Sequence, residues 1–224
     1  QVRFLLLQEI PERNRSYQTH PKGLTMQGEL VPLVSSDLHL PSDDPTLMEA
    51  IRQPRLSLFW GAHTPTRALL AMLTTIAARG HSLRVFDGGN RFDGYFVARL
   101  ARRMSAHPKA ILGRIRLSRA FTCFQLAELI ENAPAKPDPL FVLDLLNTFY
   151  DESVPLRDTE RLLTTTITHL KRLASVGPVI VGAREPRVVV KERWALLEHL
   201  QVASDAAWLL RPPEGAPVEQ PRLF

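Results

Sequence analysis

Cysteine is almost absent from this chain of 224 residues, in which Cys123 stands alone. A single cysteine excludes an internal disulfide and any zinc site built from several thiolates. Long apolar runs are also absent, since no stretch approaches the roughly 20 residues that a membrane-spanning helix needs. The opening QVRFLLLQEIPER has an apolar run too short for the core of a signal peptide. We therefore expect a cytoplasmic protein without a membrane partner.

Charge of one sign does not dominate the chain. Its 28 lysine and arginine residues face 23 acidic residues, which gives a formal net charge of +5. This excess is a mild preference for polyanionic partners, although basic proteins without such partners are common. Most of the positive charge is arginine, whose planar fork suits phosphate, while arginine-rich codon usage produces the same composition.

Strand and helix patterns alternate from residue 56 onward. Apolar segments predict strands at 56–60, 83–86, 114–118, 140–146, 178–182 and 206–210. Amphipathic segments predict helices at 67–79, 95–103, 158–174 and 192–200, and a capping box predicts one that begins at Thr122. This alternation predicts a three-layer α/β/α fold with a mostly parallel central sheet. We expect an irregular N-terminal arm at 1–42, a core domain at 43–211 and a proline-rich tail at 212–224.

The segment 56–80, LSLFWGAHTPTRALLAMLTTIAARG, has the setting of a phosphate-binding P-loop. A P-loop follows the pattern G-x-x-x-x-G-K-[ST] between a buried strand and a helix, and its backbone N–H groups bind phosphates. Gly61 keeps the first glycine. Thr66, Arg67 and Ala68 replace the second glycine, the lysine and the hydroxyl residue. The sequence therefore keeps the setting of the loop and lacks much of its chemistry.

Several polar side chains remain at this loop. Arg67 is suited to pairing with a phosphate, Thr64 and Thr66 add hydroxyl groups, and His63 lies between them and Gly61. One interpretation is a weakened anion site at a helix N-terminus. The other is a relic of the fold whose Arg67 faces solvent.

Five segments, taken in order, resemble the RecA/RadA recombinase family over about residues 44–211. SLFWGAHTPTRALLAML is similar to the family's P-loop, and RVFDGGNRFDGYFVARLARR to the next strand and its acidic turn. In RIRLSRAFTCFQLAELI, the residues Ser118, Arg119, Ala120 and Phe121 stand where the family has an alanine-arginine-alanine-aromatic motif. PLFVLDLLNTFY resembles the Walker B strand, and GPVIVGARE resembles the sensor strand. The resemblance implies a RecA-like P-loop fold.

The resemblance also implies that catalytic residues are missing. Gly89 occupies the position of the glutamate that positions the attacking water, and Arg184 stands in the segment where the family has a polar sensor amide. Asp144 matches the Walker B aspartate, which holds magnesium in the family, although such an aspartate often only caps a nearby loop. We expect no catalytic residue, no metal site and no required cofactor, and weak binding of ATP and magnesium stays open. The degenerate nucleotide site comprises Gly61, His63, Thr64, Thr66, Arg67, Asp87 and Asp144.

DNA contacts in the resembled family come from the loops after the Walker B and sensor strands. The first loop here, 150–158, is acidic and repels phosphate. The second carries Arg184, Arg187, Lys191 and Arg193, which are candidate contacts to DNA without sequence preference, or else a solvated surface. A second basic group is interpreted as ordinary surface: Arg99, Arg102, Arg103, Lys109, Arg114 and Arg116.

The first functional hypothesis is a catalytically degenerate RecA/RadA-like paralog. It would act in DNA recombination or repair by binding DNA, another recombinase-like or repair protein, or both, without ATP hydrolysis. One alternative is a weakly active DNA-dependent ATPase that uses Arg67 and a nonstandard acid. Another is a regulatory protein-interaction subunit that does not contact nucleic acid.

Overall fold

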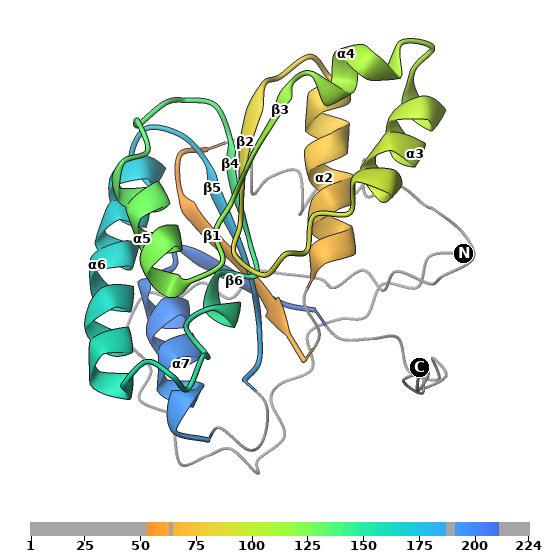
Figure 1. The fold of residues 1–224 in the computed structure, drawn as a ribbon. Coiled ribbons are helices and arrows are strands. Elements are labelled where there is room, and N and C mark those ends of the chain that lie inside the picture. Colours follow the sequence, from red (N-terminus) through yellow and green to blue (C-terminus); the bar gives the residue numbers. More distant parts are fainter. Residues whose placement is uncertain (1–52, 63–64, 187–190, 211–224) are drawn as a thin grey trace, which may run out of the picture.

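The computed structural model describes residues 53–62, 65–186 and 191–210 (Figure 1). The expected arm at 1–42 and tail at 212–224 lie outside these residues. Six parallel strands form one sheet in the order β3-β2-β4-β5-β1-β6. Their bounds are β1 (Leu56–Gly61), β2 (Leu83–Asp87), β3 (Ile115–Arg119), β4 (Leu140–Leu143), β5 (Val179–Arg184) and β6 (Ala206–Leu209).

Helices cover both faces of the sheet, as Figure 1 shows. One face carries α2 (Thr66–Ala78), α3 (Gly94–Met104) and α4 (Pro108–Leu112). The other carries α5 (Cys123–Glu131), α6 (Leu156–Ala174) and α7 (Trp194–Ala203). Connections from β1 to β3 run along the sheet in one direction and later ones in the other, so right-handed crossovers place their helices on opposite faces. The three-layer α/β/α prediction is confirmed.

Side-chain alternation along the strands supplies a core on each side. In β4, Leu140 and Val142 pack toward α5–α7, whereas Phe141 and Leu143 pack toward α2–α4. All four side chains are buried, as expected of a central parallel strand that is covered on both faces. At one edge, Trp208 of β6 stacks on Phe59 of β1 with ring centroids 4.7 Å apart. The aromatic stack fixes the edge strand to the sheet.

Several element boundaries differ from the sequence predictions. The strand predicted at 140–146 ends at Leu143, because Asp144 has a left-handed backbone (φ 51°) and the 3₁₀ helix η3 (Leu145–Asn147) follows. The helix expected to start at Asp158 begins two residues earlier, so Asp158 lies in its first turn. The helix expected at 192–200 is split into the 3₁₀ helix η4 (Lys191–Arg193) and α7. Helix α4, which starts with proline at its N1 position, is not predicted from the sequence.

α6 is the longest helix that the structure describes, with 19 residues, and it carries several charged side chains. None of the helices within 53–62, 65–186 and 191–210 has the length and apolar content that crossing a bilayer requires.

Candidate functional site at the carboxyl edge of the sheet

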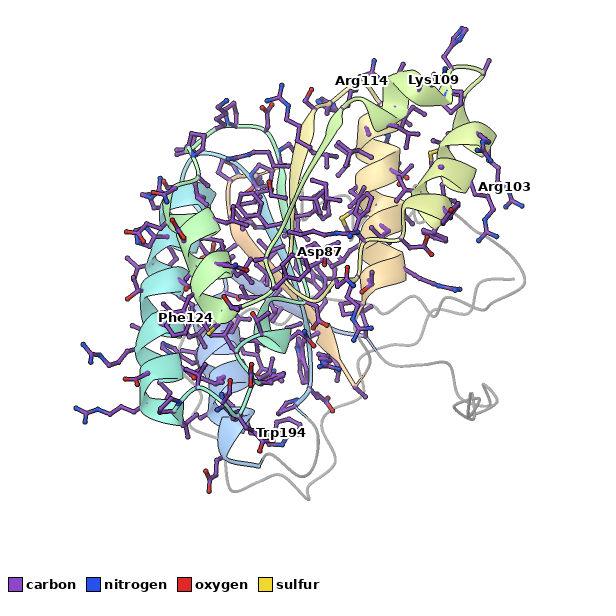
Figure 2. All side chains as sticks on the ribbon, in the orientation of Figure 1. Asp87, Arg103, Lys109, Arg114, Phe124 and Trp194 are labelled. Carbon is purple, nitrogen blue, oxygen red and sulfur yellow. The ribbon has the colours of Figure 1, made fainter. Side chains whose placement is uncertain are left out.

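The carboxyl ends of the parallel strands meet at one edge of the sheet, where ligands bind in folds of this class. The loops after β1, β2, β4 and β5 converge there and contain most of the residues that the sequence singled out. Figure 2 labels Asp87 near the middle of the molecule, at the end of β2. The candidate site therefore lies at this edge of the sheet.

Asp87 is fully buried and organises the loop that follows β2. Its Oδ1 accepts the backbone N–H of Arg91 at 2.8 Å, and its Oδ2 accepts that of Phe92 at 3.0 Å. Arg119, at the end of β3, places its Nε 3.4 Å from the same Oδ2 and donates to the Phe92 carbonyl. Asp87 thus stabilises the loop after β2, because both of its carboxylate oxygens accept hydrogen bonds from that loop.

Asp144 is the second fully buried carboxylate at this edge. Arg91 Nε lies 3.2 Å from its Oδ2, and Arg184 Nε lies 3.9 Å from the same atom. Arg184 also donates to the side-chain oxygen of Asn147 in η3. The Walker B-like carboxylate is therefore paired with guanidinium groups from the loop after β2 and the end of β5.

Gly89 approaches Asp144 so closely that no side chain fits between them. A Cβ on Gly89 would lie 2.6 Å from Asp144 Cβ and 2.7 Å from Asp144 Oδ2. Contacts under 3.0 Å force one of the two groups to move. This is the position at which the resembled family has its water-positioning glutamate. The glutamate is missing, and the room for it is missing as well.

The P-loop-like turn connects β1 to α2. Gly61 ends β1, and Thr66 and Arg67 lie in the first turn of α2, which has no side-chain cap. Arg67 is exposed and its guanidinium lies over the ring of Phe96, 5.9 Å from the centroid. It therefore points toward α3, and it forms no ion pair within the described part of the chain. His63 and Thr64 lie outside the described residues.

The described residues at this edge do not offer the usual protein ligands of a magnesium ion. Position 68 is a buried alanine without a hydroxyl ligand, and the Asp144 oxygen that faces the loop is paired with arginine. Thr66 Oγ1 is shielded from solvent and has no hydrogen-bond partner among the described residues, so it is the remaining hydroxyl at the helix start. No group of three histidine, cysteine, aspartate or glutamate side chains suited to a metal ion occurs in 53–62, 65–186 and 191–210.

The candidate DNA-contacting residues do not form one exposed group. Arg193 is only 5% exposed, and its guanidinium donates to the carbonyls of Phe149 and Val154 and to Thr159 Oγ1. Arg193 therefore fastens the loop after β4 to η4 and has little surface for a phosphate. Arg184 is engaged with Asn147 and Asp144, as described above. Arg187 and the side chain of Lys191 lie outside the described part of the chain.

Tyr150 extends the network on the far side of Arg184. Its hydroxyl donates to the Arg184 carbonyl at 2.9 Å. Burial raises the pKa of the Tyr150 phenol far above its usual range, and the nearby negative charge of Asp144 raises this pKa further. Tyr150 is consequently a neutral hydrogen-bond donor at physiological pH.

The sequence alone assigns no role to two arginines of this site, Arg91 and Arg119. Arg91 stands in the turn DGGNRFD, four residues after Asp87, and Arg119 ends β3 in the segment that resembles a recombinase motif. The nearness of Arg91 to Asp87 in the sequence is a weak indication of an ion pair. The actual partner of Arg91 is Asp144, 53 residues further along the chain.

A scan against protein-family models matches no model, and a search of curated proteins finds no similar sequence.

Proposed function

We propose that this chain is a catalytically degenerate paralog of the RecA/RadA recombinase family. It acts in DNA recombination or repair by binding a partner protein, DNA or both, and it does not hydrolyse ATP. The observation that carries the proposal is the contact between Gly89 and Asp144 together with the Arg91–Asp144 pair. In-line attack on a phosphoryl group needs a positioned water and a metal, and this arrangement provides neither.

The arrangement of the resembling segments supports the family assignment. Each of the five segments contains one strand and the loop after it. The P-loop-like, sensor-like and Walker B-like strands lie side by side as β1, β5 and β4. Segments that are far apart in the sequence thus reach one edge of the sheet, as a shared nucleotide site requires.

Catalytic groups are missing at several separate positions, which supports a protein that does not hydrolyse ATP. Arg67 turns toward Phe96, Ala68 offers no ligand, and Gly89 leaves no room for a base. A weakly active DNA-dependent ATPase needs an acid to act in place of the glutamate. Asp87 is poorly suited to this role, because both its oxygens accept backbone N–H groups.

Purification with native partners tests the proposal. The tagged chain is recovered from its own cells after nuclease treatment, with an unrelated tagged protein of similar charge as the control. We expect enrichment of a recombinase or a repair polymerase that carries its own intact active site. The proposal is contradicted if no protein of DNA metabolism is enriched over the control and the purified chain binds no added DNA. Binding of added DNA without such a partner favours direct binding, whereas enrichment of proteins outside DNA metabolism favours the regulatory subunit.

A further inference from the structure

Positive charge is concentrated in the first half of the described chain. Residues 53–127 contain twelve arginine or lysine residues and only two acidic ones, Asp87 and Asp93. Asp87 is buried, and Asp93 accepts the Phe96 backbone N–H at the start of α3. Residues 128–210 reverse the balance, with twelve acidic residues against nine basic ones.

This division along the sequence becomes a division between faces of the molecule. Helices α2, α3 and α4 lie in the basic half and cover one face of the sheet, whereas α6, α7 and the C-terminal part of α5 lie in the acidic half and cover the other (Figure 1). The face that carries α2–α4 therefore attracts polyanions, whereas the opposite face carries charges of both signs, such as Arg157, Asp158, Glu160 and Arg161 of α6.

Some arginines of the basic half have structural roles and are set aside. Arg114 donates to the Ala77 carbonyl at the end of α2, and Arg84 donates to the Pro134 carbonyl. Arg116 lies on β3 next to Ile115, whose side chain packs against the core under α2–α4. Because neighbouring strand residues point to opposite faces, Arg116 points toward the other face.

Five other exposed cations form a surface that we name the basic stripe. Arg67 and Arg99 both lie over the Phe96 ring, with guanidinium carbons 5.9 and 5.8 Å from its centroid. Arg102 and Arg103 follow on α3, opposite its buried apolar side, and Lys109 continues the stripe on α4, which packs against α3. All five side chains are exposed, and none pairs with an acidic side chain within the described part of the chain.

Figure 2 shows that part of this surface lies away from the candidate site. Arg103 and Lys109 are labelled at the outer end of α3 and α4, whereas Asp87 is labelled near the centre of the molecule. The two arginines at the end of α3 also complement the helix dipole, which accounts for some of their benefit. The helix dipole does not favour Arg67 in this way, because Arg67 lies in the first turn of a different helix, α2.

The chemistry of the stripe favours nucleic acid over a folded protein. Protein interfaces usually centre on aromatic or aliphatic anchors with little charge. Among the described residues, the helices α2–α4 expose only one large apolar side chain, Tyr95. Binding of single strands relies on several stacking rings, which this face does not supply. Guanidinium groups without acidic partners are free to bind phosphates. Cations along a helix face can contact the regularly spaced phosphates of a DNA duplex.

We propose that the basic stripe (Arg67, Arg99, Arg102, Arg103 and Lys109) binds the phosphate backbone of duplex DNA without reading its sequence. The choice of DNA among polyanions rests on the proposed function, whereas the location of the surface rests on the charges alone. The surface differs from the loops after β4 and β5, where Arg184 and Arg193 are engaged within the protein.

Fluorescence anisotropy with a labelled duplex of arbitrary sequence tests the proposal in the full-length chain. One variant carries Arg102→Glu, Arg103→Glu and Lys109→Glu. The matched control carries Arg157→Glu, Arg161→Glu and Lys171→Glu, three exposed positions on α6 with the same change in net charge. Circular dichroism and thermal unfolding verify that both variants fold.

Five phosphate contacts predict that log Kd rises with log salt concentration with a slope of about 4 to 5. In the α3–α4 variant the slope falls by about 3, and Kd rises at least roughly tenfold at low salt. The α6 control changes Kd by less than about threefold. Equal loss in both variants, or loss in neither, overturns the proposal. So does tighter binding to a single strand, or binding to vesicles with anionic lipid but not to DNA.

The outcomes separate this inference from the proposed function. A chain that recovers a recombinase or repair polymerase but binds no duplex refutes the stripe and leaves the proposed function standing. A chain that binds DNA through the stripe and also hydrolyses ATP refutes the proposed function and leaves the stripe standing.

Discussion

Arg91 Nε lies 3.2 Å from Oδ2 of Asp144, so a guanidinium from the loop after β2 pairs with the buried carboxylate after β4. The two residues are 53 positions apart in the sequence, and the neighbouring strands β2 and β4 bring them together. In an active nucleotide site of the resembled family, this carboxylate serves a metal ion. Here Oδ2 of Asp144 is paired with Arg91 and lies 3.9 Å from Nε of Arg184.

Loss of this pair should destabilise the protein. Because Asp144 is fully buried and Arg91 is 42% exposed, we expect Arg91→Ala to lower the free energy of unfolding by about 1–2 kcal/mol. Arg102→Ala, on the exposed side of α3, should change it by less than about 0.5 kcal/mol. Urea titration measures both. In an Asp144→Asn background the cost of Arg91→Ala should shrink, and an unchanged cost would show that the pair contributes nothing.

A methyl group at Gly89 should be poorly tolerated. We expect Gly89→Ala to cost about 1–3 kcal/mol, because its Cβ would lie 2.6 Å from Asp144 Cβ. Gly94→Ala is the matched control, since a Cβ there meets nothing within 4 Å and the residue starts α3. Alanine at this position should be neutral or slightly stabilising. Thermal unfolding of the two variants compares them, and equal melting temperatures would mean that the Gly89 position is open.

Arg193 should act as a structural residue and not as a DNA contact. Arg193→Met removes a buried cation from the Phe149 and Val154 carbonyls, and we expect a loss of about 3 kcal/mol in unfolding free energy. Arg157→Met, at an exposed position of α6, should change the stability little. DNA affinity per folded molecule should stay unchanged in both variants. A stable Arg193→Met protein with weakened DNA binding would reverse this assignment.

Tyr150 should make stability depend on alkaline pH. Burial raises its folded-state pKa, so the folded phenol keeps its proton while the unfolded phenol loses it above about pH 10. The folded state then binds more protons, and its stability falls as the pH rises through that range. Tyr150→Phe should flatten this fall relative to the wild type. At neutral pH it should cost about 1 kcal/mol for the lost hydrogen bond to the Arg184 carbonyl. Identical alkaline profiles for the two proteins would contradict the burial of the phenol.

The layers of the fold follow from local signals in the sequence. Apolar strands alternating with amphipathic helices predict both the sheet and its coverage, and the capping interaction at Thr122 is also confirmed. Its Oγ1 accepts the Gln125 backbone N–H at 3.2 Å. The Gln125 side chain accepts from Phe121 N and not from Thr122 N, a detail that depends on how the chain enters α5.

The contacts of the candidate site cannot be predicted from local sequence patterns. Gly89 and Arg91 meet Asp144 only because β2 and β4 are neighbours, although β3 lies between them in the sequence. The left-handed backbone of Asp144 is equally invisible in an apolar run. The sequence alone predicts ordinary surface for the arginines and lysine of α3 and α4, because their lack of acidic partners depends on which helices share a face.

ATP turnover by the purified chain tests the central claim most directly. Phosphate release is measured with magnesium, with and without single-stranded and duplex DNA, for the wild type and for Asp144→Asn. The closed arrangement of Gly89, Arg91 and Asp144 predicts that both proteins release phosphate at the rate of the buffer alone. A wild-type rate above that background which Asp144→Asn abolishes would show a working hydrolytic site and contradict the account.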